Sequence, residues 1–196
     1  MKYHPLVDHF DKSFAWMSDV LPDEVEEILD YIAFGESLKK HFPNDVTFNL
    51  SKQGGVKLTD YIPNNNAMLV VSEKLKDLLA KTGEDFEFYS VNIRDKKGRL
   101  VEKPYYLAQL VGSLPCLDWK NSDYENNDLI EGQVLYFRRL VLDAEKIPKN
   151  KHIFRLGEKE ELIIVSHDLG YEIYRTHNCR GMIFQVIEEY GKEFRG

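Results

Sequence analysis

The sequence lacks the marks of a secreted, disulfide-linked or membrane-spanning protein. Its 196 residues include only two cysteines, Cys116 and Cys179, with no CxxC spacing, which is the usage of a reducing compartment. The longest aliphatic runs, Met68–Val71 and Leu162–Val165, are far too short to cross a bilayer. The first ten residues contain no apolar segment of the kind that a signal peptide requires. We therefore expect a cytoplasmic protein without a membrane partner.

Motifs that bind cofactors or carry catalysis are also missing. The sequence contains no GxGxxG or GxxxxGK[ST] loop for phosphates, no GxSxG nucleophile turn and no HExxH metal motif. Its six histidines are scattered along the chain without metal-ligand spacing. We expect no cofactor, no metal site and no enzymatic activity.

Basic residues are too few for a nucleic-acid-binding protein. There are 33 acidic and 26 basic side chains, and the net charge is −7, which argues against naked nucleic acid as a partner. With 43% hydrophobic and 30% charged residues, the composition is that of an ordinary folded protein. The length predicts a single domain over residues 1–196.

Short alternating segments predict strands. Phe86–Ile93 places Phe86 and Phe88 on one face and Val91 on the other, which is strand periodicity. The turn sequence Asp95–Gly98 follows, and Leu100–Val111 reads as the returning strand, with Pro104 marking an edge or a bulge. Val134–Leu142 predicts a further strand. The clearest helix is predicted over residues 22–41, where apolar residues approximate a helical stripe.

Two segments of the chain resemble each other. Leu69–Leu75 and Ile163–Leu169 each join an aliphatic strand to a serine, Ser72 or Ser166, placed to cap a helix. An aromatic or apolar strand follows each helix. We predict an α+β fold with a mostly antiparallel sheet, built from two related strand–helix–strand lobes at about residues 55–111 and 133–188, with the N-terminal acidic helix packed outside. Convergence on serine caps is the alternative to a true duplication.

The predicted N-terminal helix lies in a stretch that carries acids and no basic residue. Such a run is commonly the solvated face of an amphipathic helix, but it would also steer a basic protein partner. We choose Glu24, Glu27 and Asp30 as candidate partner-binding residues. The seven carboxylates of the stretch are Asp19, Asp23, Glu24, Glu26, Glu27, Asp30 and Glu36.

A second candidate surface is an aromatic and polar segment near the middle of the chain. Aromatic anchors dominate protein interfaces, so a tryptophan and a tyrosine among polar side chains indicate an interface loop. The alternative is that Leu117 and Trp119 belong to a strand and cap the core. The candidate residues are Asp118, Trp119, Ser122, Asp123 and Tyr124.

Two other functions stay open from the residues alone. A metal-dependent phosphodiesterase would use Asp85, Asp95 and Lys97, because such cleavage needs carboxylates and a lysine at one edge. The [DE]-x-K pattern occurs no more often than chance predicts in a chain so rich in acids and lysines. A general protein-interaction module without a toxin partner is the other alternative.

The order of several weak motifs resembles one family, the bacterial immunity proteins of polymorphic toxin systems known as immunity family eleven. The resemblance covers about residues 55–188. It implies a non-enzymatic cytoplasmic protein that binds a cognate toxin and blocks it; it supplies no binding residues and no oligomeric state. The matching segments are Val70–Ser72, Phe86–Ile93, Tyr105–Leu107, Cys116–Asp118 with Ser122, Leu140–Asp143, Ile153–Leu156, Ile164–Ser166 and Gly181–Phe184.

Overall fold

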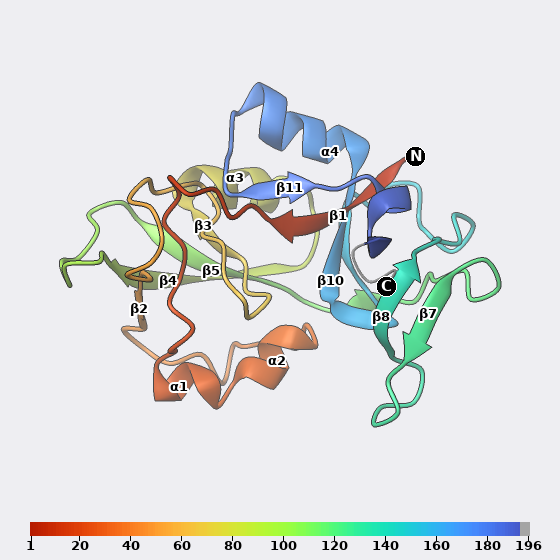
Figure 1. Ribbon diagram of the computed structural model, residues 1–196, viewed down its shortest axis with the longest axis horizontal. Helices are drawn as coiled ribbons and strands as arrows, with labels where there is room; N and C mark the ends of the chain where they lie inside the picture. Colours follow the sequence, from red (N-terminus) through yellow and green to blue (C-terminus); the bar gives the residue numbers. More distant parts are fainter. Residues whose placement is uncertain (193–196) are drawn as a thin grey trace.

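The computed structural model describes residues 1–192 and arranges them as a mixed α+β fold (Figure 1). Within that range a five-stranded sheet has the order β11-β1-β10-β9-β6, a four-stranded sheet has the order β2-β4-β5-β3, and β7-β8 form a separate hairpin. Most strand pairs are antiparallel; β2 with β4 and β6 with β9 are parallel. This confirms the predicted fold class. The strands are β1 Tyr3–Asp8, β2 Thr47–Asn49, β3 Val70–Ser72, β4 Phe86–Arg94, β5 Tyr105–Leu110, β6 Ser113–Leu114, β7 Asp123–Asn126, β8 Val134–Arg139, β9 Ile153–Leu156, β10 Lys159–Ser166 and β11 Met182–Phe184.

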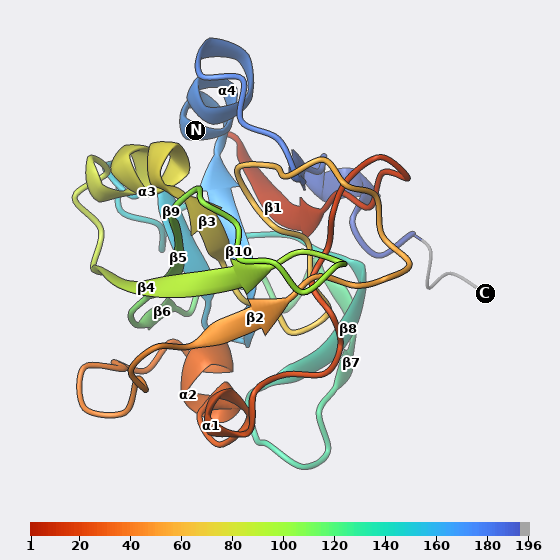
Figure 2. The same ribbon diagram turned by 90° about the vertical axis from the view of Figure 1, so that its left-hand side faces the viewer.

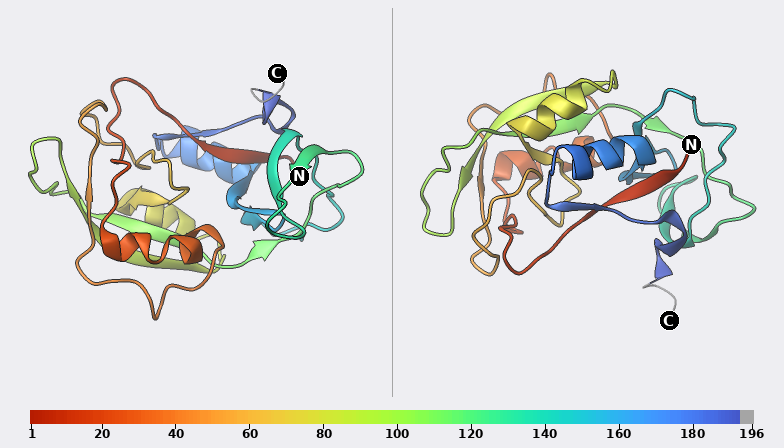
Figure 3. Two further views of the ribbon diagram at one scale, coloured as in Figure 1. Left: turned by 60° about the horizontal axis from the view of Figure 1, so that its bottom comes forward. Right: turned by 90° about the horizontal axis from the view of Figure 1, so that it is seen from above.

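The helices are short. Two α-helices near the N-terminus pack on the four-stranded sheet, and two more lie together on the opposite side of the molecule (Figures 1 and 2). Seen from above, the yellow α3 and the blue α4 run next to each other (Figure 3, right), and their apolar residues share one buried cluster. The helices are α1 Asp23–Glu26, α2 Leu29–Ala33, α3 Glu73–Ala80, α4 His167–Tyr171, the π-helix η1 Glu172–Thr176 and the 3-10 helix η2 Ile187–Glu189.

The alternating segment around Phe88 forms the predicted strand, β4, and its two faces pack into two different apolar clusters. Val91 and Ile93 are buried in a cluster with the N-terminal helices, whereas Phe86 and Phe88 pack against the cluster of α3 and α4. The turn that follows places Gly98 at φ +76, where glycine is favoured. The return pairs with β4 as β5, which begins directly after Pro104.

The helix predicted over residues 22–41 is wrong in extent. The chain forms α1 and α2 with a break at Ile28, whose φ is −114, and helical structure ends at Ala33. Gly35 then takes φ +66, and a Cβ there would lie 2.7 Å from the Arg155 side chain. Leu38 lies beyond the helix but is still buried in the apolar cluster of α1 and α2, and its backbone N–H donates to the Glu87 carboxylate at 2.8 Å.

The two predicted serine caps are confirmed. Ser72 Oγ accepts the backbone N–H of Leu75 at the start of α3, and Ser166 Oγ accepts that of Leu169 at the start of α4. In each case the strand before the cap and the strand after the helix flank a third, antiparallel strand. That third strand is β5 for β3 and β4, and β1 for β10 and β11.

The strand registers of these two units correspond. Ser72 lies opposite Tyr105 and Ser166 lies opposite Tyr3. Five residues along each central strand, Leu110 pairs with Phe86 and Asp8 pairs with Met182. This agreement supports the proposal that the lobes arose by duplication. In the first lobe the central strand β5 follows β3, α3 and β4 in the sequence, whereas in the second lobe the central strand β1 precedes β10, α4 and β11.

Side-chain hydrogen bonds repeat in the same way. The Tyr105 hydroxyl donates to the Thr59 carbonyl at 2.8 Å, and the Tyr3 hydroxyl donates to the Lys151 carbonyl at 3.1 Å. The residue after each acceptor, Asp60 or His152, contacts the hydroxyl of the capping serine. Convergence on a serine cap alone does not explain four equivalent positions, whereas the proposed duplication would account for them.

Candidate interaction surfaces

The loop at Asp118 is a tight turn bound to the neighbouring strand. Asp118 accepts hydrogen bonds from the side chain and the backbone N–H of Asn121, at 2.7 and 3.1 Å, and these bonds lower the pKa of its carboxyl. Ser122 Oγ donates to the carbonyl of Val141 at 3.1 Å and accepts its N–H at 3.0 Å. Ser122 therefore positions the loop, because its hydroxyl is already committed to Val141.

The large apolar residues of this loop divide between surface and core. Leu117 is fully buried, as the core alternative predicts, while Trp119 is 38% exposed. The Trp119 ring meets Tyr124 edge-on at 5.1 Å between centroids. The pair gives the base of the β7-β8 hairpin a rigid aromatic ridge that is partly open to solvent.

Replacing Trp119 with alanine tests which description is right. We expect the free energy of unfolding to fall by about 1–2 kcal/mol, because the truncation removes a partly buried ring and one aromatic contact. Urea unfolding followed by circular dichroism measures this. A loss of about 3 kcal/mol or more, typical of buried tryptophan truncation, would make Trp119 a core residue and remove it from the proposed surface.

The hairpin itself carries a network of charged and polar groups. Arg138 contacts Asp123 at 3.4 Å and Glu125 at 3.2 Å, and it donates to the Tyr136 hydroxyl at 2.6 Å. The Tyr136 hydroxyl in turn donates to Glu125 at 2.5 Å. These bonds cross-link β7 to β8 and hold the predicted Asp123 on the exposed side of the hairpin.

The tip of the hairpin is a surface that sequence reasoning missed. Leu129 is 93% exposed and Ile130 is 41% exposed. The turn is well formed: the Leu129 N–H donates to Asn127 Oδ1 at 3.0 Å, and the Asn127 N–H donates to the Gln133 carbonyl at 2.9 Å. The sequence feature that could have identified this surface is a pair of aliphatic residues between Asp128 and Glu131 in a turn sequence. Apolar side chains in such a turn are exposed to solvent.

The acidic helices form a second exposed surface. Glu24, Glu27 and Asp30 are all exposed, and within residues 1–192 none of the three forms an ion pair. The last turns of α1 and α2 contain no basic residue. In Figures 1 and 2 these helices and the hairpin turn both lie at the lower side of the molecule. Within the described residues, no basic side chain therefore neutralises these three carboxylates by a direct ion pair.

The residues of the phosphodiesterase alternative do not converge. Asp85 directly precedes β4 and Asp95 directly follows it, so a nine-residue strand holds them about 30 Å apart. Asp95 instead binds the guanidinium of its neighbour Arg99 at 2.6 and 2.9 Å, which lowers the pKa of Asp95 to about 2. Over the described range, no three His, Cys, Asp or Glu side chains gather closely enough to hold a metal ion.

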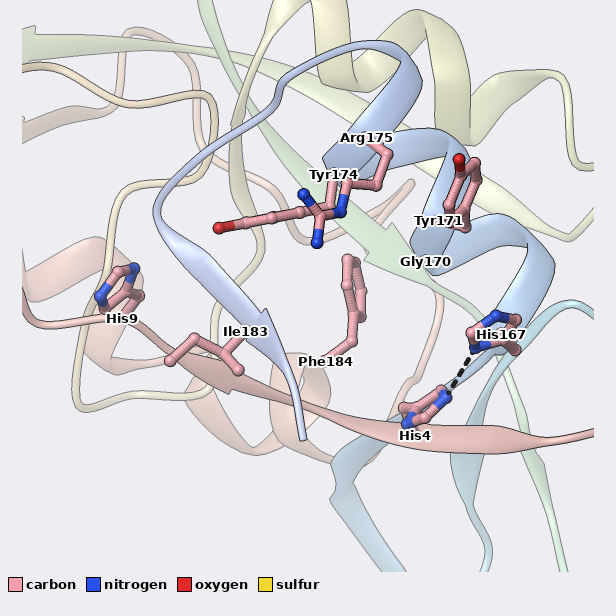
Figure 4. A pocket seen from close by; sticks show the side chains of 9 residues that line it. All are labelled: His4, His9, His167, Gly170, Tyr171, Tyr174, Arg175, Ile183 and Phe184. Atoms are coloured by element: carbon pink, nitrogen blue, oxygen red, sulfur yellow. Dashed lines mark hydrogen bonds between the residues drawn. The ribbon is translucent and has the colours of Figure 1, made fainter. Parts of the chain in front are cut away.

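A pocket of about 420 Å³ opens between β1, β11 and the helical segment α4-η1 (Figure 4). His4 closes one end, because its Nδ1 lies 3.1 Å from the Gln185 carbonyl and its Nε2 lies 3.2 Å from His167 Nδ1. The other residues that line the pocket are His9, Gly170, Tyr171, Tyr174, Arg175, Ile183 and Phe184.

Comparison with known proteins decides the family. The model of the Imm11 immunity protein family matches residues 6–189. The chain belongs to this family. The match includes the acidic helices, which lie outside the part of the sequence that carries the motif resemblance. A search of curated proteins finds no match.

Membership of the Imm11 family gives the chain an immunity function, and the general partner of such a protein is a toxin. One further observation bears on its setting: no helix within residues 1–192 has the length and hydrophobicity needed to cross a membrane.

Proposed function

We propose that this Imm11 protein neutralises its cognate toxin by binding and covering it with the β7-β8 hairpin and the acidic helices. The observation that carries the proposal is the hairpin tip, where Leu129 is 93% exposed on a hydrogen-bonded turn between two carboxylates. An apolar tip with an acidic border fits an apolar depression bordered by basic side chains. A toxin cleft that binds an anionic substrate has such a border, and filling it would exclude the substrate.

The hairpin supplies most of the expected binding energy. Burying one aliphatic side chain such as Leu129 against a partner contributes about 1.5–3 kcal/mol. Trp119 and Tyr124 at the base add an aromatic anchor of the type that dominates protein interfaces. Asp118 and Asp123 border this ridge, and Ser122 holds the loop against Val141.

The acidic helices are proposed to act mainly on the rate of association. Unpaired charges at the edge of an interface steer a partner of opposite sign and change its affinity less than its on-rate. Such a partner has a basic surface, and the net charge of −7 keeps nucleic acid away from the same face.

We also propose that the protein acts in the cytoplasm. Cys116 and Cys179 are both buried and unpaired, and burial raises the pKa of their thiols to about 12 and about 11. Buried thiols of this kind need no oxidising compartment and are poorly reactive, because the thiolate is the reactive form.

The direct test is protection. A toxin domain, sought among the genes that neighbour this one, is produced in a bacterial host with and without the immunity protein, and growth is measured together with the affinity of the purified pair. We expect growth to be restored and a stable complex to form. A chain that neither binds nor protects would overturn the proposal and favour an interaction module without this partner.

Charge reversal of Glu24, Glu27 and Asp30 to lysine tests the steering role. We expect the association rate with that toxin domain to fall about 10–100-fold at low salt, with a much smaller change in the dissociation rate. The dependence of the rate on ionic strength should also weaken. Stopped-flow fluorescence at several salt concentrations measures both.

A matched control reverses three exposed acids on other elements, Asp85, Glu102 and Glu145, and so makes the same change in net charge. We expect this control to slow association far less. Equal effects from the two triple variants, or none from the first, would remove the acidic helices from the proposed surface.

A further inference from the structure

We propose that the pocket between β11 and α4-η1 binds an extended, carboxylate-bearing segment of the same toxin, with Arg175 as the carboxylate-binding group. The inference rests on the proposed function and adds a second contact site, because this pocket is separate from the β7-β8 hairpin and the acidic helices. Figure 4 shows the Arg175 guanidinium alongside Tyr174 and above Phe184, with Tyr171 further along the helical segment.

Charge is the first argument for this ligand. In a chain of net charge −7, the nine residues that line the pocket include one arginine and three histidines and no carboxylate. Arg175 is exposed and forms no ion pair with any residue between 1 and 192. The neighbouring Glu172 contacts His177 at 3.6 Å instead. A guanidinium held beside aromatic rings, with no acid of its own, is suited to a carboxylate from a partner.

The open edge of β11 is the second argument, and it favours an extended peptide over a compact ligand. The Gln185 N–H donates to the Pro5 carbonyl of β1 at 2.9 Å, so the alternate residues Phe184 and Val186 direct their N–H groups away from β1. Over the described residues neither N–H has a hydrogen-bond partner. An added strand would satisfy them, as in other peptide complexes that extend a sheet.

The pocket reaches this edge. The side chains of Ile183 and Phe184 point to opposite faces of β11, yet both line the pocket. β1 is hydrogen-bonded along the inner edge of β11. The pocket therefore passes round the outer edge. A second hollow of about 420 Å³, bordered by Val186, lies on the other side of the His4–His167 pair and is separate from this pocket.

Comparison of the two lobes gives the third argument. In the first lobe the strand after the helix, β4, is already accompanied on its outer side by β2; in the second lobe β11 is the end of its sheet. The helix also differs, because α3 is a regular α-helix whereas α4 continues into the π-helical turn that carries Tyr174 and Arg175. π-Helical turns are rare and frequently occur at functional sites.

The test uses the cognate toxin domain and two charge reversals of equal size. Arg175→Glu should weaken binding by at least about tenfold, since it replaces attraction of the carboxylate by repulsion. Lys52→Glu, at an exposed lysine outside the pocket and without a partner among residues 1–192, should change it less than about threefold. Amide hydrogen exchange by NMR should show Phe184 and Val186 protected only in the complex, with Gln185 unchanged.

The outcomes separate this site from the proposed function. If the toxin binds Arg175→Glu as tightly as the unaltered protein and the two amides stay unprotected, the pocket proposal fails while the hairpin proposal stands. If the unaltered protein does not bind the toxin, both fail. Protection of the same amides in a concentrated sample without toxin would assign the edge to a second copy of this chain and overturn the proposal.

Discussion

Arg155→Ala is expected to lower the free energy of unfolding by about 3–5 kcal/mol, because a large buried side chain is truncated and buried carbonyl groups lose their hydrogen-bond donor. Arg155 is 1% exposed and extends from β9 to the neighbouring sheet. Burial lowers the pKa of its guanidinium to about 10, which is still far above neutral pH, so the side chain stays charged. Urea unfolding followed by circular dichroism gives the free energy.

The cost is large because the Arg155 guanidinium donates hydrogen bonds to several backbone carbonyls at once. Its guanidinium donates to the carbonyls of Leu110 at 3.0 Å, Ala33 at 3.2 Å and Glu160 at 2.9 Å. These acceptors belong to β5, to the end of α2 and to β10, so one side chain ties the two sheets and the N-terminal helices together. Removing it leaves buried carbonyls unsatisfied and opens a cavity.

An exposed arginine is the matched control for this variant. Arg99 is bound to Asp95 at the surface, and Arg99→Ala should cost no more than about 1 kcal/mol. If Arg155→Ala and Arg99→Ala lower stability equally, the buried guanidinium does not hold the sheets together as described.

The double variant Leu129→Asp/Ile130→Asp is expected to weaken toxin binding by at least about 100-fold, from the loss of two aliphatic contacts and the burial of two unpaired charges. The folded protein should be unaffected, because both side chains project from a turn and take little part in any core. Isothermal titration calorimetry with the toxin domain measures the affinity, and growth of the toxin-producing host reports protection.

Val56→Asp is the control for adding charge at an exposed apolar position, since Val56 is 83% exposed and lies outside the hairpin. It should leave the affinity within about twofold and the stability within about 0.5 kcal/mol. Full affinity in the double hairpin variant would show that the tip does not enter the toxin, and the surface would then be limited to the hairpin base and the acidic helices.

Local signals predicted much of the fold. The alternation in Phe86–Ile93 identified β4 and its two faces, because a strand with apolar groups on both sides has to lie between two cores. Ser72 and Ser166 identified two helix starts, since a capping serine acts on its own first turn. Gly98 marked the turn for a similarly local reason.

Features that depend on distant residues were not predictable in this way. Leu38 fits a helical stripe by spacing, but its position is set by the Glu87 carboxylate, which also binds Ser37 and Tyr89. Burial would raise the pKa of Glu87, yet these hydrogen bonds outweigh it and lower the pKa. Arg155 looks like an ordinary strand residue in the sequence, because nothing local shows which carbonyls it will meet.

The candidate surfaces were predicted in part. Trp119 and Asp123 were chosen for their residue types and do lie on an exposed loop and hairpin. Leu129 and Ile130 were not chosen, because an aliphatic pair signals burial unless the turn around it is known. The pocket at Arg175 needed β1 and β11 to be paired, and those strands lie at opposite ends of the sequence.

The strand β1 has a consequence for how the molecule is made. It is the central strand of the second lobe, and His4 reaches Gln185, 181 residues further along. β1 must therefore wait, unpaired, until β10 and β11 have also been synthesised. Contacts so remote in sequence slow folding, so we expect the second lobe to fold later than the first. Newly synthesised molecules would then protect against the toxin only after this delay.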